Sequence, residues 1–472
     1  MLYRAKIHGQ SCATSQSAVI CSPYDGSPVG EVSVGSAHDI EAALGSMVQG
    51  FAAMQRLATH ERVRLLEGIV AGLQQQSDAL ARLIARESGK PIRHARTEVL
   101  RAITTFSLAA AETRSFGGEL LPVDQQPGLE GRLCVFRRVA RGPIAAISPF
   151  NFPLNLVAHK LAPALAIGSS VLLKPAQQAP LTAHLLSDLV DAAGAPAGAF
   201  NVVHCTPEVG ETLVRDERPK VLSFTGSDAL GWKLKQLAGK KHVLLELGGN
   251  APCIVDEGVD LDAVMPRIVD AAWSNAGQTC IKAQRVFVHA KVFDAFVERF
   301  VAQTEALVVG DPLADATVIG PLIEQKHVQR VLEWIDEAER GGARLLTRGR
   351  VDGQLLGPTI VTGTLAGMRV RDQEVLGPVP VRESAASVEA ALDRANAGRF
   401  GLQASVFTPR LDHALRAYDV LSFGAVLVND APNLRVDNYP YGGVKDSGLG
   451  REGVRFAMEE LSEPKVLLLR GG

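Results

Sequence analysis

The run SVLLK at residues 170–174 decides the fold, because it is short and apolar and stops at Pro175. Similar apolar runs lie on both sides of it, at residues 145–147, 199–203 and 221–224. Helical patterns separate these runs, around residues 155–167, 180–193 and 207–215. Short strands that alternate with helices predict βαβ units and a parallel sheet, so the fold class is α/β. Ligands of such sheets bind where the strands end.

The rest of the chain divides into a helical region, a second alternating region and two remaining segments. Residues 36–115 are mainly helical, with a 3.6-residue apolar stripe at Leu65, Leu66, Ile69, Val70 and Leu73. Strand candidates recur within residues 252–430, at 252–255, 285–288 and 426–429, with helices near 260–276, 291–307 and 325–340. Residues 132–137 alternate like a strand, and residues 464–469 form an apolar strand without an obvious partner. An uncovered apolar edge favours pairing with another chain, so we expect a homodimer or homotetramer.

Length and composition exclude several classes of function. A chain of 472 residues is long enough for two or three domains. The net charge of −2 gives no electrostatic argument for a nucleic-acid or anionic-membrane partner. Six scattered cysteines, without a CxxC or a Cys/His cluster, indicate neither disulfides nor a metal site. The first residues do not have the pattern of a signal peptide, and no apolar run reaches about 18 residues, so we expect a cytoplasmic protein.

Cys280 is the strongest candidate for a chemical role. It ends the run NAGQTC (275–280), 34 positions after the glutamate of LELGGN (245–250). A thiol nucleophile needs a backbone that approaches an oxyanion and a base that later activates water. Gly277 and the glycine pair 248–249 allow close backbone approach, and the apolar surroundings of Glu246 would raise its pKa towards that of a usable base. A lone cysteine is more often a small buried hydrophobe, but the flanking runs favour a nucleophile.

Further runs occur in a definite order around these two residues. They are ISPFNFPL (147–154), LLKPA (172–176), FTGS (224–227) and EVLGP (374–378). Together with Glu246 and Cys280 they resemble the NAD(P)-dependent aldehyde dehydrogenase superfamily, from about Pro23 to Leu469. The resemblance implies two Rossmann-type parallel-sheet domains and a small β element for oligomerisation. The implied ranges are 1–116 and 139–247 for the NAD(P)-binding domain, 248–453 for the catalytic domain, and 117–138 and 454–472 for the oligomerisation hairpin and C-terminal strand.

The same resemblance implies a reaction at three residues. Cys280 would attack an aldehyde and form a thiohemiacetal, whose oxyanion is stabilised by the Asn151 side chain and the Cys280 N–H. After hydride has left for the nicotinamide, Glu246 would activate the water that hydrolyses the thioester. Asn151 could instead be a turn residue before Phe152 and Pro153.

The implied cofactor residues follow the strands. Lys174, which could otherwise be a surface lysine, matches lysines that bind the adenosine ribose, and Ser227 offers its hydroxyl and helix-start N–H groups to the pyrophosphate. Glu374 matches the residue that holds the nicotinamide ribose. The other implied contacts are Ser148, Phe150, Gly210, Phe224, Gly226, Leu247 and Leu376.

Gln177 bears on the choice between NAD and NADP. Many NAD-preferring relatives carry a glutamate there, which repels a 2′-phosphate by about 1–4 kcal/mol at contact range. Glutamine removes this repulsion, so the sequence predicts that NADP is accepted beside NAD.

Substrate residues are harder to infer. Arg101 and Arg435 match two of three arginines by which relatives bind anionic aldehydes, whereas Thr279 stands at the place of the third. Phe152 would line the same pocket. Both arginines could instead be structural ion-pair partners. We expect a small-molecule substrate, a short polar or anionic aldehyde of the lactaldehyde or semialdehyde type.

Lys282 departs from the pattern, because relatives usually carry a small residue two positions after the nucleophile. Its side chain could be solvated, or it could lower the pKa of the Cys280 thiol.

Three alternative functions remain open on this fold. A CoA-acylating enzyme passes the acyl group to CoA, but such relatives generally lack the glutamate found here as Glu246. An acyl-phosphate reductase would not need both Glu246 and Asn151. A non-catalytic binding, structural or redox-sensing protein would be expected to have lost the thiol or the base.

Overall fold

The first sheet has eight strands in the order β24-β12-β11-β8-β9-β10-β2-β3 in the computed structural model, which describes residues 1–470. Its parallel centre is made of β8 (Ile144–Ile147), β9 (Val171–Lys174), β10 (Phe200–Val202), β11 (Val221–Thr225) and β12 (His242–Glu246). Antiparallel strands close both edges: β2 (Ala5–Ile7), β3 (Gln10–Cys12) and β24 (Gly448–Leu449). The expected α/β class and the central strands are confirmed.

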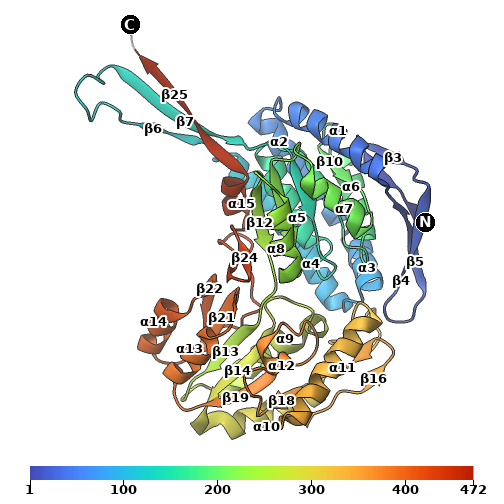
Figure 1. Ribbon diagram of the computed structural model, residues 1–472, viewed down its shortest axis with the longest axis vertical. Helices are drawn as coiled ribbons and strands as arrows, with labels where there is room; N and C mark the ends of the chain where they lie inside the picture. Colours follow the sequence, from blue (N-terminus) through green and yellow to red (C-terminus); the bar gives the residue numbers. More distant parts are fainter. Residues whose placement is uncertain (471–472) are drawn as a thin grey trace.

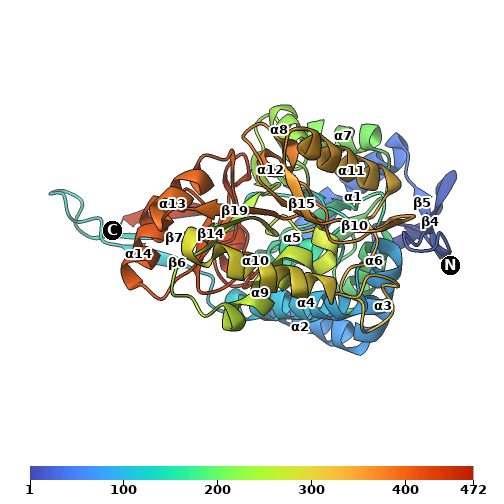
Figure 2. The same cartoon turned by 90° about the horizontal axis from the view of Figure 1, so that it is seen from below.

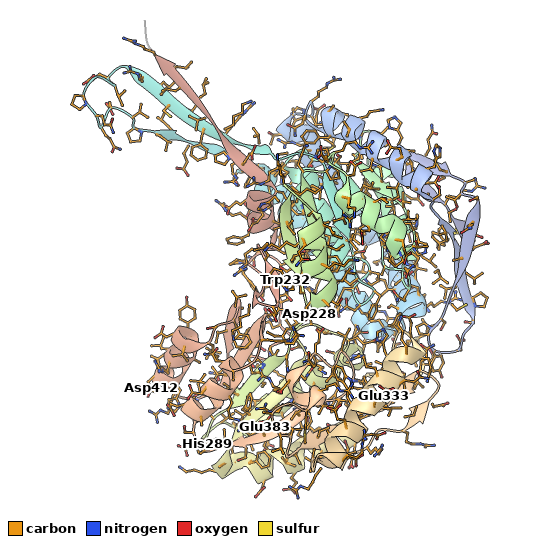
Figure 3. All side chains as sticks on the ribbon, viewed as in Figure 1. Asp228, Trp232, His289, Glu333, Glu383 and Asp412 are labelled. Carbon is orange, nitrogen blue, oxygen red and sulfur yellow. The ribbon has the colours of Figure 1, made fainter. Side chains whose placement is uncertain are left out.

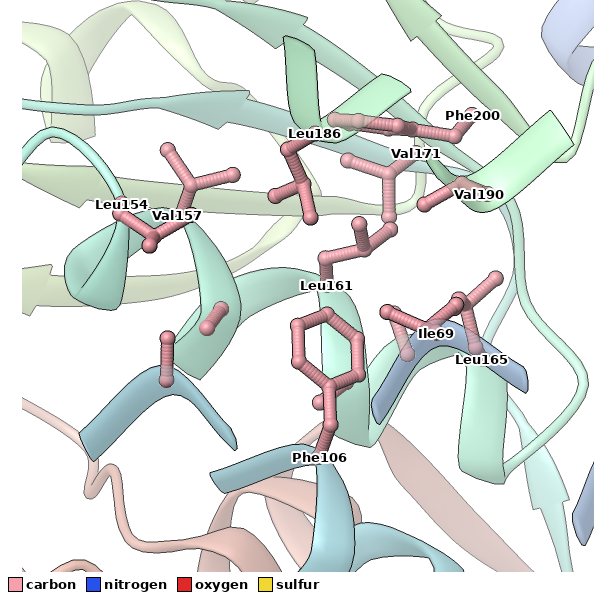
Figure 4. Close-up of a cluster of buried hydrophobic side chains, with 14 of the residues drawn as sticks. Ile69, Phe106, Leu154, Val157, Leu161, Leu165, Val171, Leu186, Val190 and Phe200 are labelled. Carbon is pink, nitrogen blue, oxygen red and sulfur yellow. The ribbon is translucent and has the colours of Figure 1, made fainter. Parts of the chain in front are cut away.

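Helices cover this sheet on both faces (Figure 1). They are α1 (Ala37–Met54), α2 (Thr59–Gln75), α3 (Ser77–Ser88), α4 (Ile92–Thr113), α5 (Asn155–Ala166), α6 (Leu181–Ala192), α7 (Pro207–Arg215) and α8 (Asp228–Leu237). The stripe expected on α2 is buried except for Val70, which is half-buried. Figure 4 shows Phe106 of α4 facing Leu161 of α5, and both side chains are fully buried. Burying such a side chain contributes about 1.5–3 kcal/mol, so this cluster fixes α5 between α4 and the sheet.

The second sheet has seven strands in the order β15-β18-β19-β14-β13-β21-β22. The strands are β13 (Ala251–Val255), β14 (Ala283–His289), β15 (Arg344–Thr347), β18 (Ile360–Thr362), β19 (Val381–Ala385), β21 (Gln403–Phe407) and β22 (Ala425–Val428). Its helices are α9 (Leu261–Trp273), η1 (Ser274–Gly277), η2 (Ala290–Val292), α10 (Phe293–Glu305), α11 (Gln325–Arg340), α12 (Arg369–Asp372), α13 (Val388–Asn396) and α14 (Leu411–Val420). All pairs in this sheet are parallel except β15 with β18. The expected second alternating region is therefore present.

Small elements complete the chain. At the N-terminus, β1 (Leu2–Tyr3), β4 (Gln16–Cys21) and β5 (Pro28–Val34) form a three-stranded sheet. Two short pairs lie in the second half: β16 (Val351–Asp352) with β17 (Leu355–Leu356), and β20 (Phe400–Gly401) with β23 (Val444–Lys445).

Another three-stranded sheet projects from the body in two perpendicular views (Figures 1 and 2). It consists of β6 (Gly118–Leu121), β7 (Arg132–Ala140) and β25 (Ser462–Arg470), with β7 in the middle. The expectation that the last strand lacks a partner was wrong, because β25 pairs with β7 along its whole length. The free edge of β25 is what remains available to another chain.

The expected range 454–472 differs from the structure in its first part. Residues 454–460 form α15 (Val454–Glu460), a helix that packs on α4 and α5 of the first sheet. The two-residue strand β24 also belongs to the first sheet, although the catalytic range was expected to extend to 453. The chain therefore returns to the first sheet before it enters the projecting strand. Residues 471 and 472 lie outside the described part.

Candidate active site

A cavity of about 510 Å³ lies at the carboxyl ends of β8, β9, β11 and β12. All the catalytic and cofactor residues expected from the sequence line it: Ser148, Phe150, Asn151, Lys174, Gln177, Gly210, Phe224, Gly226, Ser227, Glu246, Leu247, Cys280, Glu374 and Leu376. The substrate candidates Arg101, Phe152, Thr279 and Arg435 are not among the lining residues. Residues far apart in the chain thus meet in one cavity, between the two large sheets.

Cys280 follows a backbone of unusual conformation. Asn275, Ala276 and Gly277 all have left-handed dihedrals, with φ of 54°, 54° and 68°. A Cβ at Gly277 would overlap the Gly377 carbonyl oxygen, so only glycine fits there. The Gln278 side chain accepts from the Ile323 N–H at 3.0 Å and holds the turn against the segment that precedes α11. Left-handed non-glycine residues cost about 1–3 kcal/mol each, and they persist only where the surroundings fix them.

The thiol of Cys280 is in an apolar environment, and burial raises its pKa to about 11. The Tyr441 hydroxyl lies 3.5 Å from its Sγ. Asn151 donates one amide N–H to the Gln278 carbonyl at 2.9 Å, and this bond fixes the amide beside the turn that carries the cysteine. The arrangement can hold a thiol nucleophile and an amide donor in one cavity.

Glu246 is the last residue of β12 and is 5% exposed. Burial raises its pKa well above the ordinary value, and the neighbouring charge of Glu452 adds to this effect. Its Oε2 has no hydrogen-bond partner among the described residues. A Cβ at Gly249 would overlap the Cys280 carbonyl oxygen, so the glycines that follow Glu246 let the two segments touch. The rise in the Glu246 pKa expected from the sequence is confirmed in direction.

Lys174 is buried at the end of β9, so the interpretation as a solvated surface lysine was wrong. A Cβ at Gly210 would lie 2.6 Å from Lys174 Cδ, which shows how closely α7 approaches the lysine. Burial lowers the lysine pKa. Gln177 is exposed at the rim of the same cavity.

Glu374 lines the same cavity and contacts the glycines that follow Glu246. Its Oε1 accepts from the Gly249 N–H at 3.0 Å, and a Cβ at Gly248 would lie 2.5 Å from its Oε2. Burial raises its pKa to about 7. Leu376, two residues later, lines the cavity with a φ of 43°.

These features fit a bound NAD(P). The cavity is lined by both Lys174, from the first sheet, and Glu374, from the loop before β19 of the second. Glycines 210, 226 and 248 let the backbone pack directly against the lining side chains Lys174, Phe224 and Glu374, with which a Cβ would collide. Ser227 precedes α8, whose N-terminal N–H groups favour phosphate. Thr225 also lines the cavity, and its Oγ1 has no hydrogen-bond partner among residues 1–470.

Lys282 differs from one interpretation made from the sequence, that of a solvated side chain. It is 3% exposed, and its Nζ donates to the Gly377 carbonyl at 2.8 Å, so it is not solvated. Burial lowers the pKa of Lys282 itself to about 7. The lysine connects the strand after the nucleophile to the loop that follows Glu374.

Both candidate substrate arginines are paired with carboxylates. Arg101 donates to Asp437 at 2.5 Å, and Arg435 donates to Glu452 at 2.9 Å. Phe152 lies beneath Lys90, whose Nζ is 3.6 Å from the ring centre. The ion-pair interpretation of the arginines therefore describes this structure.

Comparison with known proteins now identifies the chain. The sequence profile of the Aldehyde dehydrogenase family matches residues 11–467. The chain belongs to the aldehyde dehydrogenase family. This aldehyde dehydrogenase is 38% identical over 468 residues to the 3-sulfolactaldehyde dehydrogenase of Priestia aryabhattai, covering 99% of this chain and 98% of that one. It is 40% identical over 450 residues to aspartate-semialdehyde dehydrogenase 1 of Pseudomonas canavaninivorans, with coverage of 95% and 96%.

A solved structure is similar over nearly the whole length. Aldehyde dehydrogenase 21 of Physcomitrella patens, crystallised with the reaction product succinate, superposes with a TM-score of 0.97 at 38% identity, covering 99% of this chain and 98% of that chain. Other solved relatives contain NADP or are described as NAD-dependent. The enzyme is thus an NAD(P)-dependent oxidoreductase.

Residues 1–470 contain neither a candidate membrane span nor a candidate metal-ligand cluster. None of the helices there is both long and apolar enough to cross a membrane. Likewise, no group of three or more His, Cys, Asp or Glu side chains in that part could hold a metal ion.

Some residues near the site were missed by the sequence argument. Tyr441 contacts the nucleophile, Glu452 and Lys160 form a buried pair at 3.3 Å, and His327 lines the cavity beside Phe150. Tyr441 stands in the run YPYGG (439–443), whose glycines were a signal of close approach. No signal pointed to Lys160, because a single lysine within an apolar helix pattern has no spacing to interpret.

Proposed function

We propose that this aldehyde dehydrogenase oxidises a short, polar, anionic aldehyde to its carboxylate, with Cys280 as nucleophile, Glu246 as base and Asn151 as oxyanion donor. The observation that carries the proposal is their presence in one cavity together with Lys174 and Glu374. Bound NAD(P)⁺ supplies the hydride acceptor. Lys174 and Ser227 would hold its adenosine half, and Glu374 its nicotinamide ribose.

The chain's own residues account for the remaining steps. The Cys280 thiolate adds to the aldehyde carbon, and the electron pair of the C=O bond moves to oxygen, where Asn151 and the Cys280 N–H stabilise it. Removing one such donor typically costs about 3–4 kcal/mol. Once the carbon has lost hydride, a thioester remains on Cys280. Glu246 takes a proton from water, the hydroxide adds to the thioester carbon, and the thiolate leaves with the carboxylate formed.

Charge around Tyr441 supports an anionic substrate. Five charged side chains form a network of ion pairs there: the cations Arg101, Arg435 and Lys160, and the carboxylates Asp437 and Glu452. His159, which also contacts Asp437, has a pKa lowered to about 4 by burial and adds no charge at neutral pH. Three cations against two carboxylates leave one positive charge in excess. The neighbouring Glu246 and Arg451, which interact with the same groups, add one charge of each sign and leave that excess unchanged. A substrate anion would compensate that charge without breaking the ion pairs.

The relatives favour the same substrate class. The two curated proteins compared above are named for aldehydes that carry a sulfonate or a carboxylate, and the solved relative holds succinate. Other curated relatives are named lactaldehyde dehydrogenases, which act on a neutral polar aldehyde. The excess positive charge favours the anionic members of this set.

We further propose that the sheet of β6, β7 and β25 joins subunits into a homodimer or homotetramer, and that the enzyme is cytoplasmic. The exposed leucines of β25 and its free edge support the first of these proposals. The two large sheets support a division into an NAD(P)-binding and a catalytic domain, with α15 and β24 assigned to the former.

The test is turnover of the purified enzyme with NAD⁺ and NADP⁺ on matched neutral, carboxylated, sulfonated and phosphorylated short aldehydes, without added CoA. We expect kcat/KM about tenfold or more higher for the anionic members. Cys280→Ala should abolish turnover, and Cys21→Ala, at an exposed cysteine, should retain it. Turnover that survives in Cys280→Ala would reject the proposed nucleophile. Turnover that appears only when CoA is added would replace hydrolysis by acyl transfer.

A further inference from the structure

The Tyr441 hydroxyl is the side-chain group in hydrogen-bond contact with the sulfur of Cys280, at 3.5 Å. Tyr441 itself is 2% exposed, so water does not compete freely for this hydroxyl. A neutral thiol can donate to a phenol or accept from it, but a thiolate can only accept. When the sulfur is ionised, the hydrogen bond therefore runs from tyrosine to cysteine, and it favours the charged form.

The tyrosine ring is fixed by both backbone and side-chain contacts. Its N–H donates to the Glu452 carbonyl at 2.9 Å, and the Glu452 N–H donates back to the Tyr441 carbonyl at 2.6 Å. The guanidinium of Arg435 lies 3.8 Å from the ring centre, and Glu452 holds that guanidinium at 2.9 Å. One residue, Glu452, thus positions both the tyrosine and the cation that covers its ring.

Arg435 also strengthens the hydroxyl as a donor. A cation over an aromatic face attracts the π-electrons of the ring. Electron density drawn from the phenol makes its O–H a better donor. The tyrosine pKa is raised well above its usual range, mainly by burial, so the hydroxyl keeps its proton for donation at working pH.

We propose that Tyr441 is a catalytic residue of this enzyme, whose O–H stabilises the Cys280 thiolate before and during attack on the aldehyde. The inference rests on the proposed role of Cys280 as nucleophile. Other charged groups act on the same sulfur: Glu374 and Glu246 oppose its ionisation, while Arg435 favours it. These groups act on the sulfur only through their charge. Tyr441 instead donates a hydrogen bond directly to the sulfur, in a site where burial disfavours the thiolate.

The test measures the reactivity of Cys280 without substrate or cofactor. Wild type and Tyr441→Phe are alkylated with iodoacetamide between about pH 7 and 9, and modification of Cys280 is followed by peptide mass spectrometry. We expect the rate to fall about tenfold in the variant across this range, because losing a hydrogen bond to a charged group changes an ionisation equilibrium by roughly that factor. Tyr439→Phe is the matched control. Tyr439 lies in the same loop as Tyr441, but its hydroxyl donates to Gln403 at 2.7 Å.

A second reagent separates electrostatics from a shifted side chain. If Tyr441 acts through the thiolate, iodoacetamide and the bulkier N-ethylmaleimide should slow by the same factor. Unequal factors would show altered access and overturn the proposal, as would equal rates in wild type and Tyr441→Phe. Melting temperatures of both variants verify folding. Failure of the proposed function is visible separately, as turnover that survives in Cys280→Ala.

Discussion

At the scale of single residues, Glu246 connects burial with chemistry. Its raised pKa means that the carboxylate, the form that accepts a proton from water, appears only as pH rises through that pKa. We expect Glu246→Gln to keep a first burst of reduced cofactor while steady-state turnover falls by about a hundredfold or more, the usual range for a lost general base. Rapid mixing under single- and multiple-turnover conditions measures both quantities.

The matched control for the turnover measurement is Glu333→Gln, at an exposed glutamate on α11 (Figure 3).

The raised pKa of Glu246 also affects the stability of the protein. The native state keeps the Glu246 proton at pH values where the unfolded chain loses it, so this residue lowers stability as pH rises above about 4.5. Glu246→Gln should lack this decline. For catalysis, a steady-state rate of Glu246→Gln equal to that of wild type would show that another group activates water.

Gln177 gives a second prediction at this scale. It lies exposed at the cavity rim, three residues after Lys174. We expect Gln177→Glu to reduce kcat/KM with NADP⁺ by tenfold or more and to change that with NAD⁺ by less than about threefold, because a carboxylate repels only the 2′-phosphate. The ratio of the two specificity constants is the measurement. Equal losses with both cofactors would indicate a damaged pocket rather than selective repulsion.

At the scale of elements, Lys282 ties β14 to the loop between α12 and β19. Its pKa of about 7 lies below the ordinary 10.5, so the unfolded chain binds more protons than the native state between these values. The stability of wild type relative to Lys282→Met should therefore rise from about pH 7 towards pH 10. Denaturant unfolding at several pH values measures this slope. Lys326→Met, at an exposed lysine, is the control, and parallel curves for wild type and Lys282→Met would contradict the prediction.

The sequence predicted some elements well and others not at all, for physical reasons. Long periodic segments such as α2 and the apolar strands of both sheets have patterns that identify them from local sequence. The strand β24 has two residues, and it pairs with β12 through Glu246 with Gly448 and Leu245 with Leu449, which are 202 and 204 positions apart. No local pattern encodes such a contact. The same limit applies to the site. Motifs placed Cys280 and Glu246 in one cavity, but the contact of Tyr441 joins residues 161 positions apart.

At the scale of the whole molecule, the projecting sheet predicts assembly. Val466 and Leu468 share one face of β25 and are 60% and 54% exposed. We expect wild type to elute as a multiple of its 50.2 kDa chain mass, and Val466→Lys with Leu468→Lys to give a smaller species, because lysines on an edge strand oppose pairing. Light scattering coupled to size exclusion measures the mass. Leu411→Lys, at a leucine 74% exposed on α14, is the control, and a single-chain mass for wild type would refute the assembly.

The proposed base and the proposed nucleophile belong to different sheets, so their distance depends on how the two large sheets are oriented. Glu246 ends a strand of the first sheet, Cys280 precedes a strand of the second, and only residues 247–250 join β12 to β13. Arg399 reaches across to Asp228 of α8 at 2.6 Å, at the end of the helix that faces the second sheet in Figure 3. A slight rotation of one sheet against the other would separate base from nucleophile while every helix stayed intact. Heat should therefore inactivate the enzyme at a lower temperature than the one at which its circular dichroism signal collapses.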